Sequence, residues 1–260
     1  MTWNWDPDTF ATHWFSDAND LMPDPLRYRS RFATREGLDA HHAAVRASCD
    51  SDERGRINLL MHTISQCEMR VEIIGSTVRH YRGDGTTHKQ YRIVGAYTAH
   101  YAALLFQTAM NDEFGDIRAE LLRPESLPAA ITAAIPPCTP GTARPETFHV
   151  DDIKPPPAAA NGYFADDRRI AEHRRFRRLA DRPADGGGHA ILRLGNYHAR
   201  SDRHRFIQWY DITGDGRYIE QRNSTHLDIR PVAPQNLTGV FTAWIDTAAR
   251  RLREDQPQYR

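Results

Sequence analysis

The sequence is poor in lysine and cysteine and lacks a long apolar run. Among its 34 basic residues only Lys89 and Lys154 are lysines, and the others are arginines. An equal number of acidic residues balances them, so no overall field attracts a polyanion or an anionic membrane. The longest apolar run, residues 101–106, falls far short of the roughly 18 residues that cross a membrane. These absences predict a protein that neither binds nucleic acid nor inserts into a membrane.

The three cysteines, Cys49, Cys67 and Cys138, lie far apart and form no CxxC pair. This spacing favours buried thiols in a reducing compartment over a disulfide framework or a zinc site. The first residues lack the basic region and the apolar stretch of a signal peptide. A hydrophobic fraction of 40% and a charged fraction of 26% are ordinary for a folded domain. We therefore expect a globular cytoplasmic protein with one large domain or two medium ones.

Sequence motifs of the common enzyme classes (GxSxG, GxGxxG, GxxxxGK and HExxH) are absent. Gly186–Gly188 precedes a strand-like segment and no Lys-Ser/Thr pair, which favours a linker turn over a phosphate cradle. Asp211–Gly216 lacks the third ligand position and the closing glutamate of a calcium loop, which favours a hairpin turn. His198, Asp202 and His204 are close in sequence, but the arginines around them would repel a divalent cation. The sequence thus predicts no metal site, no cofactor and no catalytic residue.

Hydrophobic periodicity indicates a mixture of helices and strands. Helices are expected from Asp6, after Thr34, from Ser51, and over residues 166–180 and 237–252. Strands are expected at residues 3–5, 71–78, 91–99, 101–108, 117–122, 189–197, 205–212, 217–221 and 225–230. A long polar hairpin connection, residues 81–88, joins two of these strands. Long loops on a rigid sheet commonly carry recognition, although a merely mobile hairpin tip is the alternative.

A twelve-residue pattern occurs twice, from Pro124 to Ile135 and from Pro234 to Ile245. Each copy reads PxxL, then an apolar residue, Thr-Ala and Ile at the same spacing, and strand-like segments precede each copy. This order favours an internal duplication over a solenoid repeat. Residues 136–162 separate the halves, and seven prolines between 136 and 160 favour an extended spacer. We expect a single domain over residues 1–260, with similar lobes at 1–135 and 163–260.

Arginines dominate the helix expected at residues 166–180, where Ile170, Phe176 and Leu179 form an apolar side. Nucleic-acid binding would need such a stripe together with a basic balance over the whole chain, which is lacking. A solvated arginine face is therefore favoured over a docking face for an acidic partner.

Short landmarks follow one another along the chain in a characteristic order. The first are a tryptophan strand with its helix (residues 3–14), a Pro-Asp-Pro-Leu segment (23–26) and a group of strands (70–122). An Ile-Pro turn (135–141), a Phe-His-Val segment (148–150), an Asp-x-x-Gly-Asp-Gly-Arg-Tyr hairpin (211–218) and a strand that ends in Pro-Val-Ala-Pro (227–234) follow. This order resembles the EspG family, cytosolic chaperones of type VII (ESX) secretion in mycobacteria and their relatives. The resemblance implies an α+β fold in which two similar lobes, related by quasi-twofold symmetry, share a central antiparallel sheet flanked by helices. It also implies that the chain binds the tip of the PPE subunit in a PE–PPE heterodimer, masks an apolar patch there and helps to direct the pair to its secretion machine.

The resemblance also implies where the partner binds, because family members use the sheet, the long hairpin loop of the first lobe and the C-terminal helical region. Carried over to this sequence, the contacts fall in the loop from Arg79 to Gln90 and on the adjoining strands. The expected loop contacts are Arg79, Tyr81, Arg82, Asp84, Thr86, Thr87 and His88. Tyr91, Phe206 and Trp209 are candidate apolar anchors, and arginines are candidates for the polar rim.

Two other functions compete with this interpretation. An α+β enzyme, such as a hydrolase, would need a cleft that joins residues such as His100, Asp211 and His226. A structural homodimer would bury an exposed apolar patch symmetrically, and a homodimer is also the form considered for the unbound chaperone.

Overall fold

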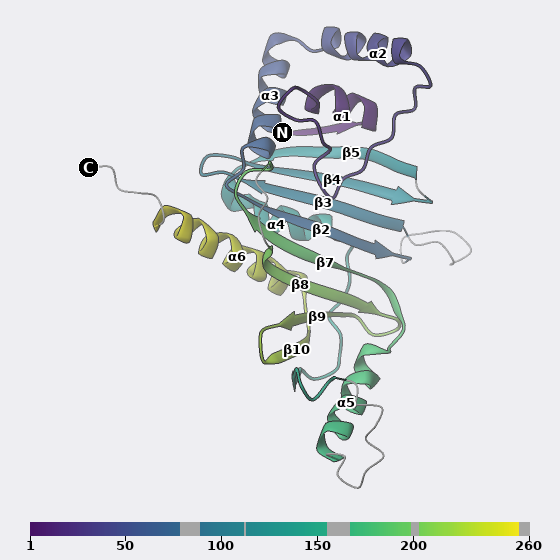
Figure 1. The fold of residues 1–260 in the computed structure, drawn as a ribbon, viewed down its shortest axis with the longest axis vertical. Coiled ribbons are helices and arrows are strands. Elements are labelled where there is room, and N and C mark those ends of the chain that lie inside the picture. Colours follow the sequence, from purple (N-terminus) through teal and green to yellow (C-terminus); the bar gives the residue numbers. More distant parts are fainter. Residues whose placement is uncertain (79–88, 112, 155–166, 199–202, 255–260) are drawn as a thin grey trace.

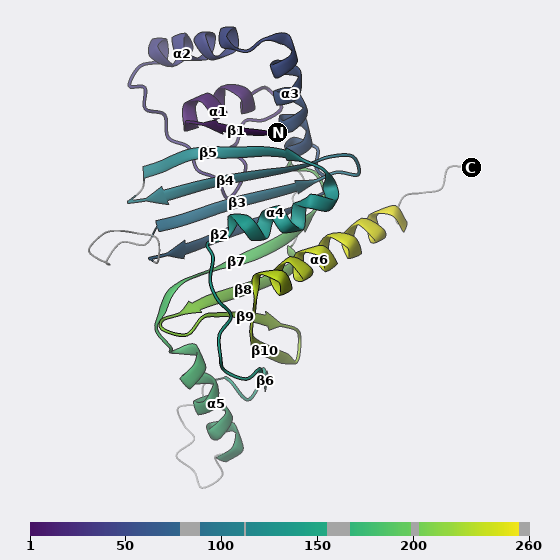
Figure 2. The same cartoon turned by 180° about the vertical axis from the view of Figure 1, so that it is seen from behind.

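The computed structural model describes residues 1–78, 89–111, 113–154, 167–198 and 203–254. These residues form one antiparallel sheet of ten strands in the order β1-β5-β4-β3-β2-β7-β8-β9-β10-β6 (Figure 1). Helices lie on both faces of the sheet, as the two opposite views show (Figures 1 and 2). The predicted α+β class is therefore confirmed. None of the described helices is long and apolar enough to cross a membrane.

The chain builds each half of the sheet from an edge strand, one or more helices, a four-strand meander and a final helix. The first half comprises β1 (Thr2–Trp5), α1 (Pro7–Trp14), α2 (Arg35–Ser48), α3 (Ser51–Ser65), β2 (Met69–Thr77), β3 (Lys89–Tyr97), β4 (Ala102–Met110), β5 (Glu113–Leu122), the 3-10 turn η1 (Pro124–Ser126) and α4 (Leu127–Ala134). The second half comprises β6 (Glu146–His149), α5 (Asp167–Ala180), β7 (Ala184–Leu194), β8 (Arg203–Ile212), β9 (Arg217–Arg222), β10 (His226–Pro231) and α6 (Pro234–Glu254).

A quasi-twofold axis relates the two halves and passes between β2 and β7. On either side of this central pair, the strand order repeats as a meander followed by a short edge strand, β1 or β6. β2 and β7 are antiparallel, and Ile73 lies opposite Ala190 near the middle of the pair. The helices that follow the two meanders, α4 and α6, pack against each other on one face of the sheet (Figure 2). The sheet thus has the symmetry that the repeated sequence pattern predicted.

The repeated PxxL pattern forms the starts of α4 and α6, and equivalent side chains make equivalent hydrogen bonds. In α4 the Thr132 hydroxyl donates to the Pro128 carbonyl at 3.0 Å, and in α6 the Thr242 hydroxyl donates to the Thr238 carbonyl at 3.0 Å. The Thr238 hydroxyl also donates to Thr132 Oγ1 at 2.9 Å and joins the two helices. This correspondence supports an internal duplication.

The larger core lies between α4, α6 and the sheet. The apolar stripe of α6 is buried there, namely Leu237, Phe241, Trp244, Ile245 and Ala248. The spacing of three and four residues in this stripe places all five side chains on one side of the helix. Burial of each large apolar side chain contributes about 1.5–3 kcal/mol. The stripe of α6 therefore belongs to the core.

A second core lies on the opposite face, where α1 and α3 cover β3, β4 and β5. Asp6 begins α1 as its N-cap, because its carboxylate accepts hydrogen bonds from the backbone N–H groups of Asp8 and Thr9 at 3.1 and 3.2 Å. Phe10 and Trp14, four residues apart, are then buried against the sheet. These helices close the upper part of this face and leave the middle of the sheet uncovered.

Part of the segment expected to be a spacer belongs to the sheet. Residues Glu146–His149 form β6, which pairs with β10, and Phe148 is buried against Phe176 of α5 at a ring distance of 5.6 Å. The prolines of this segment predicted an extended spacer, but the side chain of Phe148 completes the core under α5. Residues 155–162 of the expected spacer lie outside the described residues.

Candidate partner-binding face

An open area of the sheet lies between two groups of helices on the face seen in Figure 1. On this face α1 and α3 cover one end of the sheet, and α5 covers the other through Phe176 and Leu179. Between them, no helix of the described chain covers β2, β7 and β8 (Figure 1). We call this area the open face and define it by Ile74, Ser76, His189, Ile191, Phe206, Gln208 and Tyr210.

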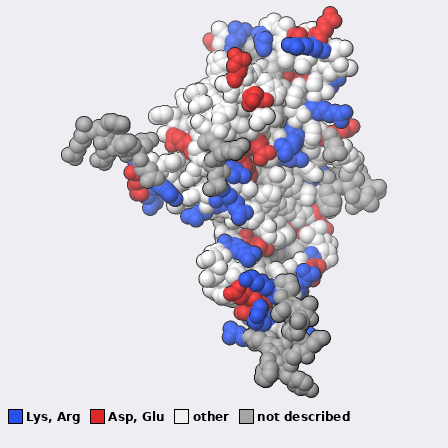
Figure 3. Space-filling model, in the orientation of Figure 1, with Lys and Arg blue, Asp and Glu red and all other residues white. Residues whose placement is uncertain are grey.

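The residues of the open face come from alternate positions of β2, β7 and β8, since successive side chains of a strand point to opposite faces. Most are half-buried, and Tyr210 is 36% exposed. Phe206 lies beside His189, with ring centres 5.9 Å apart, and the Arg203 guanidinium lies 4.6 Å from the Phe206 ring centre. Burial lowers the pKa of His189, so the ring is neutral at neutral pH. The space-filling view shows uncharged surface in the middle of the molecule, with charged side chains at its margins (Figure 3).

A groove of about 480 Å³ crosses the open face over the glycines of the two central strands. Gly186–Gly188 lie within β7, paired with β2 on one side and β8 on the other, so the expectation of a linker turn is wrong. Gly75 lies opposite Gly188. A Cβ on Gly75 would come within 2.1 Å of the Tyr91 ring, and one on Gly188 within 2.7 Å of the Trp209 ring. Glycine is required here because two large rings of the core pack directly on the backbone.

The groove is lined by groups without formal charge. Gln208 donates a hydrogen bond to the Tyr210 hydroxyl, which in turn donates to Glu220 at 3.3 Å, so one wall has a fixed conformation. The lining residues are Ile74, Gly75, Ser76, Gln90, Ala184, Gly186, Gly187, Gly188, His189, Gln208, Trp209 and Tyr210. A charged group that entered would lose water without a counter-ion among these lining residues, so the groove favours apolar or neutral polar side chains.

A network of arginines and one glutamate links the central strands at the other end of the open face. Glu72 is 5% exposed and accepts hydrogen bonds from Arg70 Nε and Arg193 Nε, each at 2.7 Å. Arg70 also donates to the carbonyl of Asn196 at 3.1 Å and packs against the Tyr197 ring at 5.4 Å. Two guanidinium groups with one carboxylate give this end a positive excess, which suits a polar rim.

The residues expected as partner contacts have different places in the structure. Arg79, Tyr81, Arg82, Asp84, Thr86, Thr87 and His88 lie outside the described residues. Phe206 lies on the open face. Tyr91 and Trp209 are only 3% and 1% exposed, on the side of α4 and α6, and present no surface to a partner in this conformation. Instead, the Tyr91 hydroxyl donates to the Gly187 carbonyl at 3.2 Å and supports the groove from behind.

The sequence did not single out Ile74, His189, Gln208 or Tyr210, although all four lie on the open face. Alternation along the strands gives the side of the sheet to which each residue points. It does not show that helices leave this part of the sheet uncovered. The missing signal was the coverage of each face, which depends on contacts between distant segments.

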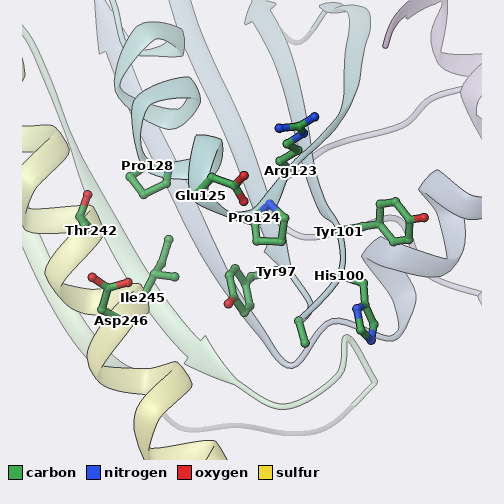
Figure 4. A pocket seen from close by; sticks show the side chains of 11 residues that line it. Tyr97, His100, Tyr101, Arg123, Pro124, Glu125, Pro128, Thr242, Ile245 and Asp246 are labelled. Atoms are coloured by element: carbon green, nitrogen blue, oxygen red, sulfur yellow. The ribbon is translucent and has the colours of Figure 1, made fainter.

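The residues considered for a hydrolase are not brought together. Asp211 is 2% exposed and accepts two hydrogen bonds from Arg217, whereas His226 contacts Thr225 and lies beside His149 on the edge of the sheet. His100 lines a larger hollow of about 990 Å³, whose lining includes neither Asp211 nor His226 (Figure 4). Within the described chain, no group of three or more metal-ligating side chains is found. His198 contacts Asn19 at 3.0 Å, and Asp202 lies outside the described residues.

Comparisons with known proteins give a family and a fold. A search of curated proteins finds no match. A solved structure of the Mycobacterium tuberculosis type VII secretion system chaperone EspG5, in complex with a PE25–PPE41 dimer, matches with a TM-score of 0.57 at 12% identity, covering 92% of this chain and 93% of EspG5. HtdX of the same organism aligns over 89% of this chain and 99% of its own at 13% identity, but its TM-score of 0.19 is too low to bear on the fold. The model of the EspG family matches residues 6–240, so this chain belongs to the EspG family.

Proposed function

We propose that this protein is a cytoplasmic chaperone of type VII secretion that binds the PPE subunit of a PE–PPE heterodimer through the open face. The observation that carries the proposal is an uncharged, half-buried area on β2, β7 and β8 between two groups of helices. Membership of the EspG family and the fold shared with EspG5, whose solved structure contains a PE–PPE dimer, support the choice of partner.

The composition of the open face suits a protein partner better than a reaction. Stable interfaces combine a largely uncharged centre with a polar rim, and a few tyrosine, tryptophan or arginine side chains supply most of the binding energy. Ile74, Phe206 and Tyr210 provide such a centre, and Arg193 and Arg203 lie toward its margin. The one histidine of the face, His189, lies beside Phe206 and has its pKa lowered by burial. We therefore assign binding to this face rather than catalysis.

An apolar helical tip of the partner would cover the open face and remain shielded from water until export. Ser76 near the end of β2 and Gln90 near the start of β3 line the groove. Loop contacts between these two strands, predicted from the family resemblance, would therefore extend the same surface. Those contacts, Arg79 to His88, stay a prediction.

Co-expression with the PE–PPE pairs of the same genome, followed by size-exclusion chromatography with light scattering, tests the proposal. We expect one pair to form a stable complex with one copy of each chain, and the same experiment shows whether the unbound protein is a homodimer. Failure with every pair, using folded protein, would refute the proposed function.

A pair of variants tests the site within that complex. Tyr210→Ala removes an exposed ring from the open face, and we expect about tenfold weaker binding. Leu21→Ala is the control, since Leu21 is 70% exposed and lies outside the open face. Equal binding by both variants and the unmodified protein would place the partner elsewhere on the chain. Replacement of residues 79–88 by a Gly-Ser segment of equal length tests the loop separately.

A further inference from the structure

A second hollow, of about 990 Å³, lies on the side of the sheet that carries α4 and α6. It opens between the β3–β4 turn, the start of α4 and the middle of α6 (Figure 4). Its apolar walls are Tyr97, Tyr101, Pro124, Pro128 and Ile245. Tyr101 is 43% exposed, among the few large apolar side chains of the described chain with so much free surface.

The quasi-twofold axis provides an equivalent place in the other half, and there the chain itself fills the space. The equivalent walls are the β8–β9 turn, the start of α6 and the end of α4. Residues 136–141 leave α4 and cross to β9, where the Arg217 N–H donates to the Thr139 carbonyl at 2.7 Å and the Gly141 N–H donates to the Arg217 carbonyl at 3.1 Å (Figure 2). Arg217 Nη2 also donates to the Pro136 carbonyl at 2.8 Å. The crossing segment is extended and contains three prolines, Pro136, Pro137 and Pro140.

The two halves differ because their final helices differ in length. α4 has 8 residues and ends before Pro136 and Pro137, which cannot continue a helix. α6 has 21 residues and continues past Ile245, the equivalent of Ile135, to Glu254. It therefore leads the described chain away from the sheet, and no described segment crosses the hollow of the first half.

The turn residue at the mouth of each site also differs, since it is a glycine in the filled site and a tyrosine in the open site. In the filled site a Cβ on Gly216 would come within 2.5 Å of the Thr139 carbonyl oxygen, so the crossing segment packs directly on the backbone. In the open site the corresponding turn residue is Tyr101. The open site thus has aromatic walls that an extended segment could contact in place of this backbone packing.

We propose that the hollow binds an extended, proline-containing segment of a partner polypeptide, in the place that residues 136–141 occupy in the other half. Extended proline-rich segments bind grooves lined with aromatic rings, because their conformation is already ordered before binding. Two tyrosines, two prolines and an isoleucine provide such walls here. This proposal is independent of the proposed function, since it uses a different side of the sheet.

The charges around the hollow give the bound segment a direction. Asp246 lies on the α6 side, whereas Arg123 and Glu125 lie where the sheet leads into α4 (Figure 4). The segment in the filled site runs from the helix toward the strand, so a bound segment would begin near Asp246 and end near Tyr101. A basic residue at its start would match Asp246, and an acidic residue at its end would match Arg123.

Peptides that copy the crossing segment test the proposal by NMR titration of the full chain. The probe is KIPPSTPGE, which carries residues 135–141 with serine in place of Cys138 and a charge at each end. We expect it to shift the amide signals of the β3–β4 turn, η1 and the middle of α6. Replacement of its prolines by alanine should weaken binding about tenfold, and exchange of its terminal charges about threefold. Absence of shifts at millimolar peptide, or equal binding by the alanine peptide, would overturn the proposal.

Two variants of α6 locate the binding. Thr242→Trp fills the hollow from an exposed position of the helix, whereas Thr247→Trp makes the same change at an exposed position that does not line the hollow. We expect Thr242→Trp to abolish the peptide shifts and Thr247→Trp to preserve them, with both spectra otherwise those of the folded protein. Peptide shifts that persist in Thr242→Trp would show that the peptide binds elsewhere and would reject the assignment.

Discussion

Removal of the Asp211 carboxylate, in the variant Asp211→Ala, should destabilise the fold strongly. The side chains of Asp211 and Arg217 are 3% and 4% exposed, and two hydrogen bonds of 2.7 and 2.8 Å join them. Without the carboxylate, the Arg217 guanidinium stays buried with its hydrogen bond to the Pro136 carbonyl. Loss of one partner of a buried pair costs about 3–5 kcal/mol, because the remaining charge has no compensation.

The double variant Asp211→Leu with Arg217→Met separates this cost from the contribution of the pair itself. Replacement of both charges by apolar groups of similar volume is often neutral, because the desolvation of both ions disappears with their attraction. The lost hydrogen bond to Pro136 should cost about 1 kcal/mol. We therefore expect the double variant to be more stable than Asp211→Ala by about 2 kcal/mol or more.

Urea unfolding followed by circular dichroism measures these differences. With a slope of about 3 kcal/mol per molar urea, the loss in Asp211→Ala corresponds to a midpoint lowered by about 1–1.7 M. A loss below about 1 kcal/mol would show that water or a rearranged partner compensates Arg217, and would refute the argument from burial.

Three further changes have defined outcomes. Gly75→Ala places a Cβ 2.1 Å from the buried ring of Tyr91, so the free energy of unfolding should fall by about 1–3 kcal/mol. Gly239→Ala has no atom within 4 Å of its new Cβ and lies inside α6, so it should raise the free energy of unfolding by about 0.5–1 kcal/mol; a loss would contradict the open space around it. Hydrogen bonds from Tyr218 and Arg182 hold the pKa of Asp215 well below its usual value of 3.8, so its stabilising contribution is complete above that value and is lost as the pH falls below it. Tyr218→Phe removes the larger of these causes and should make stability fall less steeply between pH 4 and pH 2 in acid titrations monitored by unfolding; an unchanged slope would contradict the assignment.

The helices and most strands were predictable from sequence because local signals define them. Asp6 and Pro7 mark the start of α1, and the stripe of Ile57, Leu60, Met61 and Ile64 identifies the buried side of α3. The prediction of a turn at Gly186–Gly188 was wrong because three consecutive glycines normally indicate a turn. Here they lie inside a strand, where large rings of the core require glycine. The open face could not be predicted, since it depends on which helices cover each part of the sheet.

Strand order also determines how far apart in sequence the paired segments are. Within each meander, β2 to β5 and β7 to β10, every strand pairs with the next one along the chain. β1 pairs with β5, β2 with β7 and β6 with β10 only after long intervening segments. Pairings between neighbouring segments have the smaller loop-closure cost and form earlier. We therefore expect the two meanders to form first during folding, with their junction along β2 and β7 and the closure of both edges as the slow steps.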